Sequence, residues 1–274
     1  MEWIKQALDR ARDERGHSSD ANSRQAQKPS RGSHVKAPAE QKVVYSQTRR
    51  LNISVDHLRQ NRVISGLSDP IVQQYNMLRT HVVQRMRANN WRSLAITSPI
   101  EGAGKTLTAI NLAICLAREV NHTVLLVDLD LKRPRIRQYF SDEDLPGISD
   151  YLIEDAALAD LFFNPGVERL VVLPGHKSLI HSSEMLSSPK VVSLVDDLKN
   201  RYPARIVLFD LPPVLACDDV LAFSPYFDSV LLVAEEGGTS KADLKRSIEL
   251  LEKTEIIGTV LNKSRHNRQG YSYY

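Results

Sequence analysis

The chain has 274 residues, of which 42% are hydrophobic and 25% are charged, and its formal net charge is +3. That length allows one or two domains with a sizeable core, and the composition is that of a globular protein. It excludes a small disulfide scaffold, and a net charge this small gives no reason to expect a nucleic-acid partner. The two cysteines and eight histidines show no metal-ligand spacing, so no zinc site is expected.

The first fifty residues differ from the rest of the chain. Apolar residues at helical spacing predict a short amphipathic helix over residues 1–15. Residues 16–50 are rich in Ser, Gln, Asn, Ala and Pro and carry more basic than acidic side chains, which indicates a disordered basic linker. This linker is either a solvated tether or a tether that also contacts anionic lipid or an acidic partner. The sequence has no run of about 20 apolar residues and no secretory signal, so we expect a cytoplasmic protein.

Residues 51–264 are predicted to form one domain of alternating helices and strands. A helix is expected from Pro70, capped by Asp69, to Ala88, and another from Ser240, where Asp243 completes a start similar to a capping box. Six segments are rich in Val, Leu and Ile without alternation, as in strands buried on both faces. They are Ser93–Thr97, Thr123–Asp128, Arg169–Leu173, Arg205–Asp210, Ser229–Ala234 and Ile256–Asn262. The expected fold is α/β, a doubly wound, mostly parallel sheet with helices on both faces.

A glycine-rich loop follows the first predicted strand and precedes a helix rich in Ala, Leu and Ile. Small residues let backbone N–H groups surround phosphate oxygens, with a helix N-terminus behind them. In such loops a lysine binds the β- and γ-phosphates and a hydroxyl binds Mg²⁺. The residues predicted to bind in this way are Gly102, Ala103, Gly104, Lys105 and Thr106. Pro99 stands where the strict motif has its first glycine. The sequence therefore predicts a P-loop NTPase fold that binds ATP and Mg²⁺, with one departure from the motif.

Three aspartates follow two of the predicted strands. Asp128 and Asp130 follow one strand, and Asp210 ends another. Because the carboxyl ends of parallel strands share one edge of a sheet, we expect these carboxylates to converge on the P-loop. A phosphate loop with such carboxylates is the minimum equipment for Mg²⁺-dependent phosphoryl transfer. Asp218 and Asp219 are expected to cap the next helix rather than to touch substrate.

These motifs resemble those of the bacterial tyrosine kinases (BY-kinases), P-loop proteins of polysaccharide synthesis and export, and especially the exosortase-associated cytoplasmic autokinases. The P-loop resembles the family's Walker A motif, Val127–Pro134 its A′ motif, and Asp210–Pro213 its Walker B motif. The likeness extends from about Ser65 to the end of the chain. The first fifteen residues also resemble the amino terminus of the exosortase-associated members.

The resemblance implies a role for each residue of the site. Lys105 would neutralise the β- and γ-phosphates, and Thr106 and Asp210 would hold Mg²⁺. Asp128 would accept the proton of the attacking tyrosine and contact the metal, with Asp130 in support. Asn262, at the end of the last strand, would contact adenine; a strand-ending turn residue is the alternative.

The last four residues contain three tyrosines, Tyr271, Tyr273 and Tyr274, in a chain that is only 6% aromatic. The resemblance implies that they are autophosphorylated in trans, on a neighbouring copy; a partner-docking or chance tail is the alternative. We therefore predict a non-specific protein-tyrosine kinase, with a kinase domain over residues 51–264 and a flexible tail over 265–274. It would regulate exopolysaccharide synthesis or export.

The leading alternative function is a partition-type P-loop ATPase switch that positions a membrane or polysaccharide complex without phosphorylating tyrosine. Such ATPases carry an extra lysine near the start of the P-loop, where this chain has Ile100, and this difference favours the kinase.

The resemblance also bears on assembly. Ring-forming members of the family carry an E-x-x-R-x-x-R motif. Here Gln73 and Asn76 replace two of its residues and only Arg79 remains, which removes a charge-assisted bridge that could set the register of subunits in a ring. Transient or partner-driven oligomers would still permit transfer in trans. The family resemblance further implies a separate membrane activator of the chain-length-determinant type. This partner would recruit the protein to the inner face of the plasma membrane, with the amino-terminal helix as a candidate contact.

Overall fold

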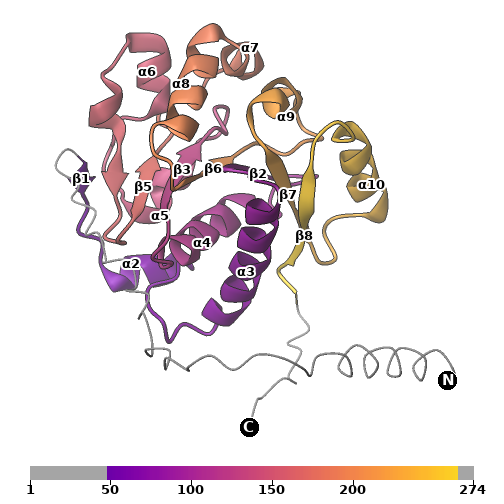
Figure 1. Ribbon diagram of the computed structural model, residues 1–274, viewed down its shortest axis with the longest axis horizontal. Helices are drawn as coiled ribbons and strands as arrows, with labels where there is room; N and C mark the ends of the chain where they lie inside the picture. The colour runs from indigo at the N-terminus through magenta and orange to yellow at the C-terminus, as the bar shows by residue number, and fades with distance from the viewer. Residues whose placement is uncertain (1–47, 265–274) are drawn as a thin grey trace, which may run out of the picture. The chain divides into compact units, whose positions relative to one another are not determined.

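The computed structural model describes residues 48–264, which form an eight-stranded sheet with helices on both faces (Figure 1). The strand order is β1-β4-β5-β3-β6-β2-β7-β8, and every neighbouring pair is parallel except β4 and β5. The strands are β1 (Arg49–Arg50), β2 (Ser93–Thr97), β3 (Thr123–Asp128), β4 (Phe163–Asn164), β5 (Leu170–Leu173), β6 (Arg205–Asp210), β7 (Ser229–Glu235) and β8 (Ile256–Asn262). The doubly wound, mostly parallel α/β fold is confirmed.

Parts of the predicted organisation lie outside the described residues. The amphipathic helix, most of the basic linker and the tyrosine tail fall on residues 1–47 and 265–274. Arg49 and Arg50, which were expected in the linker, form β1 and pair in parallel with β4. Arg49 also forms an ion pair with Glu143 at 2.7 Å. The sheet therefore begins before Leu51, because backbone pairing holds two residues whose side chains carry no strand pattern.

The six predicted strands are all present. β2, β3, β6 and β8 have the predicted bounds, and β7 continues one residue further, to Glu235. β5 begins one residue later than predicted because Arg169 has a φ of 64°, outside the extended region. The two-residue strands β1 and β4 were not predicted.

The described helices are α2 (Val55–Gln60), α3 (Val72–Ala88), α4 (Lys105–Ala117), α5 (Ile136–Phe140), α6 (Ile148–Glu154), α7 (Ser182–Leu186), α8 (Pro189–Asn200), α9 (Asp219–Phe223) and α10 (Lys241–Leu250). Short 3₁₀ turns cover Leu158–Leu161 and Ser224–Tyr226. No helix in the described part of the chain is long and apolar enough to cross a membrane.

Two of the predicted helix starts differ in detail from the structure, and one matches it. α3 begins at Val72 rather than Pro70, because the Asp69 carboxylate accepts from the N–H of Ile71 within a preceding turn. α10 begins as predicted, since the Ser240 hydroxyl accepts from the N–H of Asp243 at 3.0 Å. The capping prediction for α9 is wrong. Asp218 makes no side-chain cap bond there, and Asp219, which is fully buried, pairs with a lysine instead.

The sheet separates two apolar cores. Neighbouring residues of β3 point to opposite faces, so that Leu126 joins the core beneath α3 and α4, whereas Leu125 joins the core beneath α8 and α9. Figure 1 shows α3 and α4 together over one side of the sheet and α8 and α9 on the other. Both leucines are completely buried, as expected for a central strand covered on both faces.

This topology brings three strand ends to one edge. β6 lies between β2 and β3, and Asp210 of β6 is in register with Asp128 of β3 and Ile96 of β2. The P-loop leaves β2 two residues later and enters α4 at Lys105. The aspartates at the ends of β3 and β6 therefore lie beside the phosphate loop, at the carboxyl edge where open α/β sheets bind ligands.

Candidate nucleotide-binding and phosphoryl-transfer site

The loop between β2 and α4 has the backbone that a phosphate cradle requires. Gly102 and Gly104 have φ values of 80° and 90°, a left-handed conformation that favours glycine. A Cβ atom on Gly104 would lie 2.2 Å from Nδ2 of Asn262, so the close approach also requires glycine. Asn262 in turn donates to the carbonyl of Ala103 at 2.8 Å. The loop is thus bonded to the end of β8, and α4 presents its N-terminal amides to the same space.

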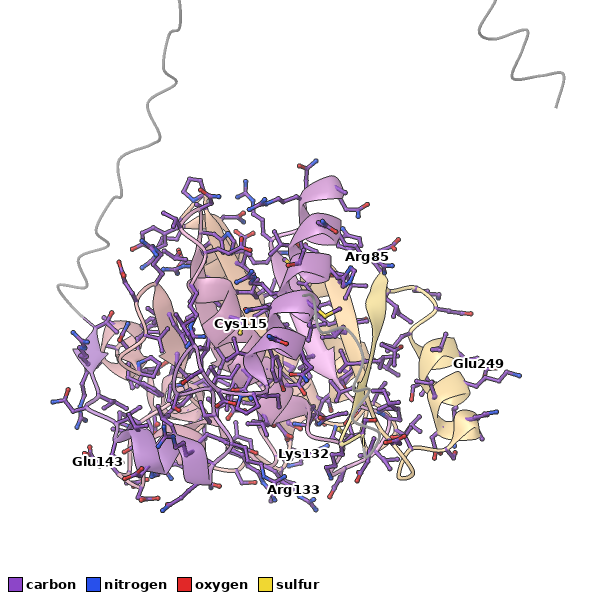
Figure 2. All side chains as sticks on the ribbon, turned by 90° about the horizontal axis from the view of Figure 1, so that it is seen from below. Arg85, Cys115, Lys132, Arg133, Glu143 and Glu249 are labelled. Carbon is purple, nitrogen blue, oxygen red and sulfur yellow. The ribbon has the colours of Figure 1, made fainter. Side chains whose placement is uncertain are left out.

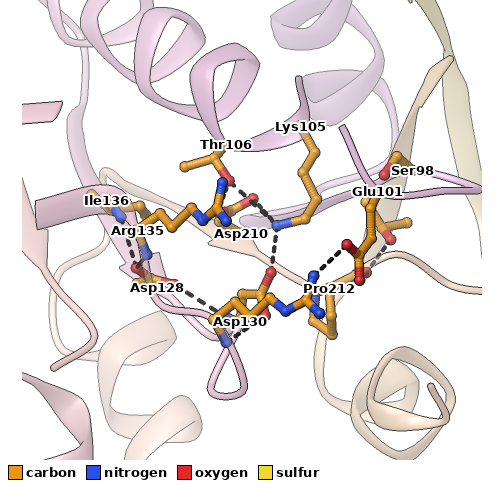
Figure 3. A network of polar contacts seen from close by, with 12 residues as sticks. Ser98, Glu101, Lys105, Thr106, Asp128, Asp130, Arg135, Ile136, Asp210 and Pro212 are labelled. Carbon is orange, nitrogen blue, oxygen red and sulfur yellow. Dashed lines mark hydrogen bonds and ion pairs between the residues drawn. The ribbon is translucent and has the colours of Figure 1, made fainter. Parts of the chain in front are cut away.

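Lys105 reaches from the first turn of α4 into the group of carboxylates (Figure 3). Its Nζ atom lies 2.8 Å from Oδ2 of Asp130 and 3.5 Å from Oδ1 of Asp210. Its side chain is only 12% exposed. Burial alone would lower the pKa of Lys105, but the charges of Asp210 and Asp130 outweigh it and raise that pKa, so the ammonium stays charged.

Thr106 and Asp210 form the deepest part of the site. The Thr106 hydroxyl donates to Oδ2 of Asp210 at 2.7 Å. The other carboxylate oxygen, Oδ1, is buried and has no hydrogen-bond partner among residues 48–264, although the Lys105 ammonium is near it. Burial raises the pKa of Asp210 to about 6, against the opposing effects of Lys105 and Thr106. A buried acceptor of this kind is suited to a cation.

Asp128 is completely buried and held by backbone groups. Its Oδ2 atom accepts from the N–H groups of Arg135 and Ile136 at 3.0 and 2.9 Å, and its Oδ1 atom accepts from the N–H of Asp130 at 3.3 Å. Burial, followed by the negative charge of Asp210, raises the pKa of Asp128 to about 7. This carboxylate is therefore fixed in place, and its pKa is in the range that suits a general base at neutral pH.

A glycine that the sequence analysis missed packs against Asp128. A Cβ atom on Gly175 would lie 2.2 Å from Cβ of Pro134 and 3.3 Å from Cγ of Asp128. The loop after β5 can therefore approach the A′ segment only with glycine at this position. The Pro-Gly dipeptide Pro174–Gly175, directly after a predicted strand, is the signal that could have indicated it.

All the predicted site residues within the described range lie at this edge of the sheet. Lys105, Thr106, Asp130 and Asp210 contact one another, Asp128 adjoins them through Asp130 and Arg135, and Asn262 contacts the loop at Ala103. Tyr271, Tyr273 and Tyr274 lie outside the described residues. These donors suit Mg²⁺ with a nucleotide, since Mg²⁺ commonly uses one or two carboxylates together with phosphate oxygens and water.

Together, the parallel sheet, the P-loop and its carboxylates define a P-loop NTPase. The model of a family described as AAA domain matches residues 92–260, and the chain belongs to that family. It is 28% identical over 221 residues to tyrosine-protein kinase YwqD of Bacillus subtilis, covering 78% of this chain and 92% of YwqD. It is 29% identical over 207 residues to putative tyrosine-protein kinase EpsB of Ralstonia nicotianae, covering 75% of this chain but only 27% of EpsB.

Solved structures agree with this placement. The kinase domain of the Escherichia coli tyrosine kinase ETK matches with a TM-score of 0.69 and 25% identity, over 85% of this chain and 89% of that domain. The septum site-determining protein MinD of Pyrococcus horikoshii, complexed with Mg-ADP, matches with a TM-score of 0.53 and 25% identity, over 65% of this chain and 72% of MinD. Within the P-loop proteins, this chain is a member of the bacterial tyrosine kinases.

Proposed function

We propose that this chain is an ATP- and Mg²⁺-dependent protein-tyrosine autokinase, which transfers the γ-phosphate to the tail tyrosines of a neighbouring copy. The observation that carries the proposal is the convergence of one ammonium, one hydroxyl and three carboxylates at the P-loop. They belong to Lys105, Thr106, Asp128, Asp130 and Asp210. The names of the similar proteins support tyrosine as the acceptor. Added phosphate would change the charge of the tail and so regulate exopolysaccharide synthesis or export.

The P-loop side of the site would bind and orient the nucleotide. Lys105 would bind the β- and γ-phosphates, exchanging its contact with Asp130 for phosphate oxygens. Thr106 and Asp210 would hold the metal, for which the buried Oδ1 atom of Asp210 is available. Mg²⁺, when bound, neutralises negative charge on the phosphates. Asn262 would contact adenine from the end of β8.

Asp128 would act on the acceptor. A tyrosine hydroxyl has an ordinary pKa of about 10 and is a weak nucleophile at neutral pH. As its oxygen forms the new bond to the γ-phosphorus and the bond to the bridging oxygen of ADP breaks, the phenolic proton would pass to Asp128. The raised pKa of this carboxyl, about 7, suits a group that must accept a proton and later release it. Asp130 would support this step by holding Lys105 in the free protein.

The competing function is an ATPase switch, in which water takes the place of tyrosine and the bound nucleotide controls association. The likeness to MinD keeps this alternative open, because the two functions use the same fold. Ile100, where partition-type ATPases carry a second lysine, favours the kinase. The two functions differ in whether the γ-phosphate is recovered on Tyr271, Tyr273 or Tyr274, or as free phosphate.

A membrane activator is the second part of the proposal. We expect a chain-length-determinant type of protein to bind this cytoplasmic chain at the inner face of the plasma membrane and to stimulate it. The amino-terminal helix predicted over residues 1–15 is the proposed contact. Deletion of those residues should weaken co-purification with such a partner and leave nucleotide binding intact. Unchanged co-purification would exclude the helix as the contact.

The direct test is intact-mass spectrometry of the full chain after incubation with Mg²⁺ and ATP, with peptide mapping of the last ten residues. We expect phosphate on the tail of the wild type and none in Lys105→Met. Tyr202→Phe is a matched control, since Tyr202 is 49% exposed on the described domain, and it should not change the added mass. Free phosphate without phosphotyrosine would instead establish the ATPase switch.

Transfer between copies can be tested by mixing two variants. One keeps the site but lacks residues 265–274, and the other carries Lys105→Met with an intact tail. Phosphate on the second chain would show transfer in trans, and its absence, with an active wild type, would limit transfer to the same chain. Asp128→Asn should keep ATP binding and lose tail phosphorylation; wild-type labelling of that variant would contradict the role of Asp128.

A further inference from the structure

The segment that follows the A′ aspartates is strongly basic. It lies between β3 and the start of α5, and two of its cations are labelled in Figure 2. Counting Arg137 in the first turn of α5, three of the four cations have carboxylate partners: Lys132 with Asp219 at 3.0 Å, Arg137 with Asp144 at 2.9 Å, and Arg133 with Glu101. The fourth, Arg135, is exposed, and its guanidinium has no hydrogen-bond or ion-pair partner within residues 48–264.

The backbone of Arg135 is nevertheless fixed to the site. Its N–H donates to Oδ2 of Asp128 at 3.0 Å, so the root of the side chain lies directly beside the carboxylates. Figure 3 shows the side chain extending from this point toward Thr106 and Asp210, and toward the space that the Lys105 ammonium enters from α4. The backbone of Arg135 is thus held beside the carboxylates, while its guanidinium is left available to a ligand.

The charge of Arg135 also acts on Tyr139, a half-buried residue of the helix that Arg135 precedes. Tyr139 lies in α5, four residues after Arg135, which is the N-cap residue of that helix. The pKa of Tyr139 is raised by burial and by the charge of Asp210, and lowered in part by the charges of Arg135 and Lys105. The Tyr139 hydroxyl is thus subject to the charges of the guanidinium, the ammonium and the Walker B carboxylate together.

The site contains more acidic than basic side chains, so a second cation would improve its charge balance once a nucleotide binds. Within residues 48–264, Lys105 is the one ammonium in contact with the carboxylates of Asp130 and Asp210, and Asp128 adds a third acid beside them. A triphosphate brings further negative charge into this space. A guanidinium suits phosphate oxygens well, because its planar donors can bond two of them at once.

We propose that the Arg135 guanidinium binds the γ-phosphate oxygens of ATP, and so makes this residue a sensor that distinguishes ATP from ADP. No covalent bond forms or breaks at Arg135; it neutralises charge on the group to be transferred. The proposal rests on ATP as the nucleotide of the proposed function, but not on tyrosine as the acceptor.

Equilibrium binding to the full chain tests the proposal without any transfer step. The probes are Mg²⁺ with a non-hydrolysable ATP analogue and Mg²⁺ with ADP, titrated by calorimetry into wild type, Arg135→Ala, Arg135→Lys and Arg137→Ala. Arg135→Ala should weaken binding of the analogue about tenfold or more, as for loss of a charge-assisted hydrogen bond, and change ADP binding less than about twofold. Arg135→Lys should be intermediate, because it keeps the charge but loses the planar donors.

Arg137→Ala is the matched control, since it removes a guanidinium from the same segment whose partner is Asp144. It should bind both nucleotides as the wild type does. Equal weakening of analogue and ADP by Arg135→Ala, or no weakening of either, would overturn the proposal. A wild type that binds the analogue but never labels tyrosine would refute the kinase and leave the role of Arg135 intact.

Discussion

Asp128, the proposed acceptor of the tyrosine proton, is expected to destabilise the free protein. The pKa of this buried carboxyl is raised from 3.8 to about 7, so the folded protein keeps a proton that the unfolded chain has already lost. A folded-state pKa above the unfolded one means that stability is full below about pH 4 and is lost as the pH rises toward 7. A tenfold change in proton affinity corresponds to ~1.4 kcal/mol, which sets the cost of ionising Asp128 at ~4 kcal/mol or less.

Asp128→Asn should remove most of this cost. The carboxamide oxygen can still accept from the N–H groups of Arg135 and Ile136, and only the longer contact with the N–H of Asp130, at 3.3 Å, is lost. We therefore expect the variant to be ~2–4 kcal/mol more stable than the wild type at pH 8 without nucleotide. At about 2–4 °C per kcal/mol for a domain of this size, the melting temperature would rise by roughly 4–16 °C.

The assay is scanning calorimetry of both proteins at pH 5 and pH 8, with chelator and without nucleotide. The difference in melting temperature should be largest at pH 8 and clearly smaller at pH 5, where the folded wild type keeps Asp128 protonated and only the unfolded chain has ionised it. Asp142→Asn is the control, because it makes the same charge change at a side chain that is 94% exposed. A variant no more stable than the wild type at pH 8, or a difference independent of pH, would refute this account of Asp128.

Three further changes test contacts around the site. Lys132→Met leaves the fully buried Asp219 without the ammonium that lies 3.0 Å from it. The free energy of unfolding, measured in urea, should fall by ~2–3 kcal/mol, near the lower end for buried pairs because Lys132 is 38% exposed. Adding Asp219→Asn should recover most of that loss, and a double variant as unstable as the single one would argue against the pair. Gly175→Ala should lower phosphoryl transfer more than tenfold and stability by ~1–3 kcal/mol, measured by tail labelling and melting, since its Cβ would meet Pro134 at 2.2 Å. Asn262→Ala removes the 2.8 Å bond to the loop and should weaken ATP binding several-fold in calorimetry, with unchanged affinity excluding a role for that bond.

The sheet was predictable because its central strands are buried on both faces, and this burial leaves a continuous apolar run in the sequence. Thr123–Asp128 and Arg205–Asp210 each end in the aspartate that the site uses, so the strand prediction also placed two carboxylates. Their convergence followed from parallel pairing alone. β1 and β4 could not be predicted in this way, because two residues are too few to show a pattern and their pairing is purely a matter of backbone bonds.

Contacts between distant segments were not predictable from local pattern. Asp219 was expected to cap α9, because an acid before an apolar stretch usually has that role. Instead its buried carboxylate forms an ion pair with Lys132, which lies 87 residues earlier in the chain. The same holds for Gly175, whose need for glycine arises from Pro134 in a different loop. Each of these contacts joins the A′ segment, in which Asp128 lies, to another element, and neither leaves a signal in the local sequence.

The division of labour among the three aspartates also follows from contacts rather than from motifs. Asp130 and Asp210 share the Lys105 ammonium, so both are partly neutralised in the free protein. The carboxylate of Asp128 is bonded to backbone N–H groups instead. Burial raises the pKa of both Asp128 and Asp210, to about 7 and about 6, so Asp128 binds its proton more tightly than Asp210 does. In the proposed nucleotide complex, phosphate oxygens would draw Lys105 away, and Asp130 and Asp210 would lose that neutralising charge together. A cation at the buried oxygen of Asp210 would replace it, and this exchange would couple binding of the metal to binding of the nucleotide.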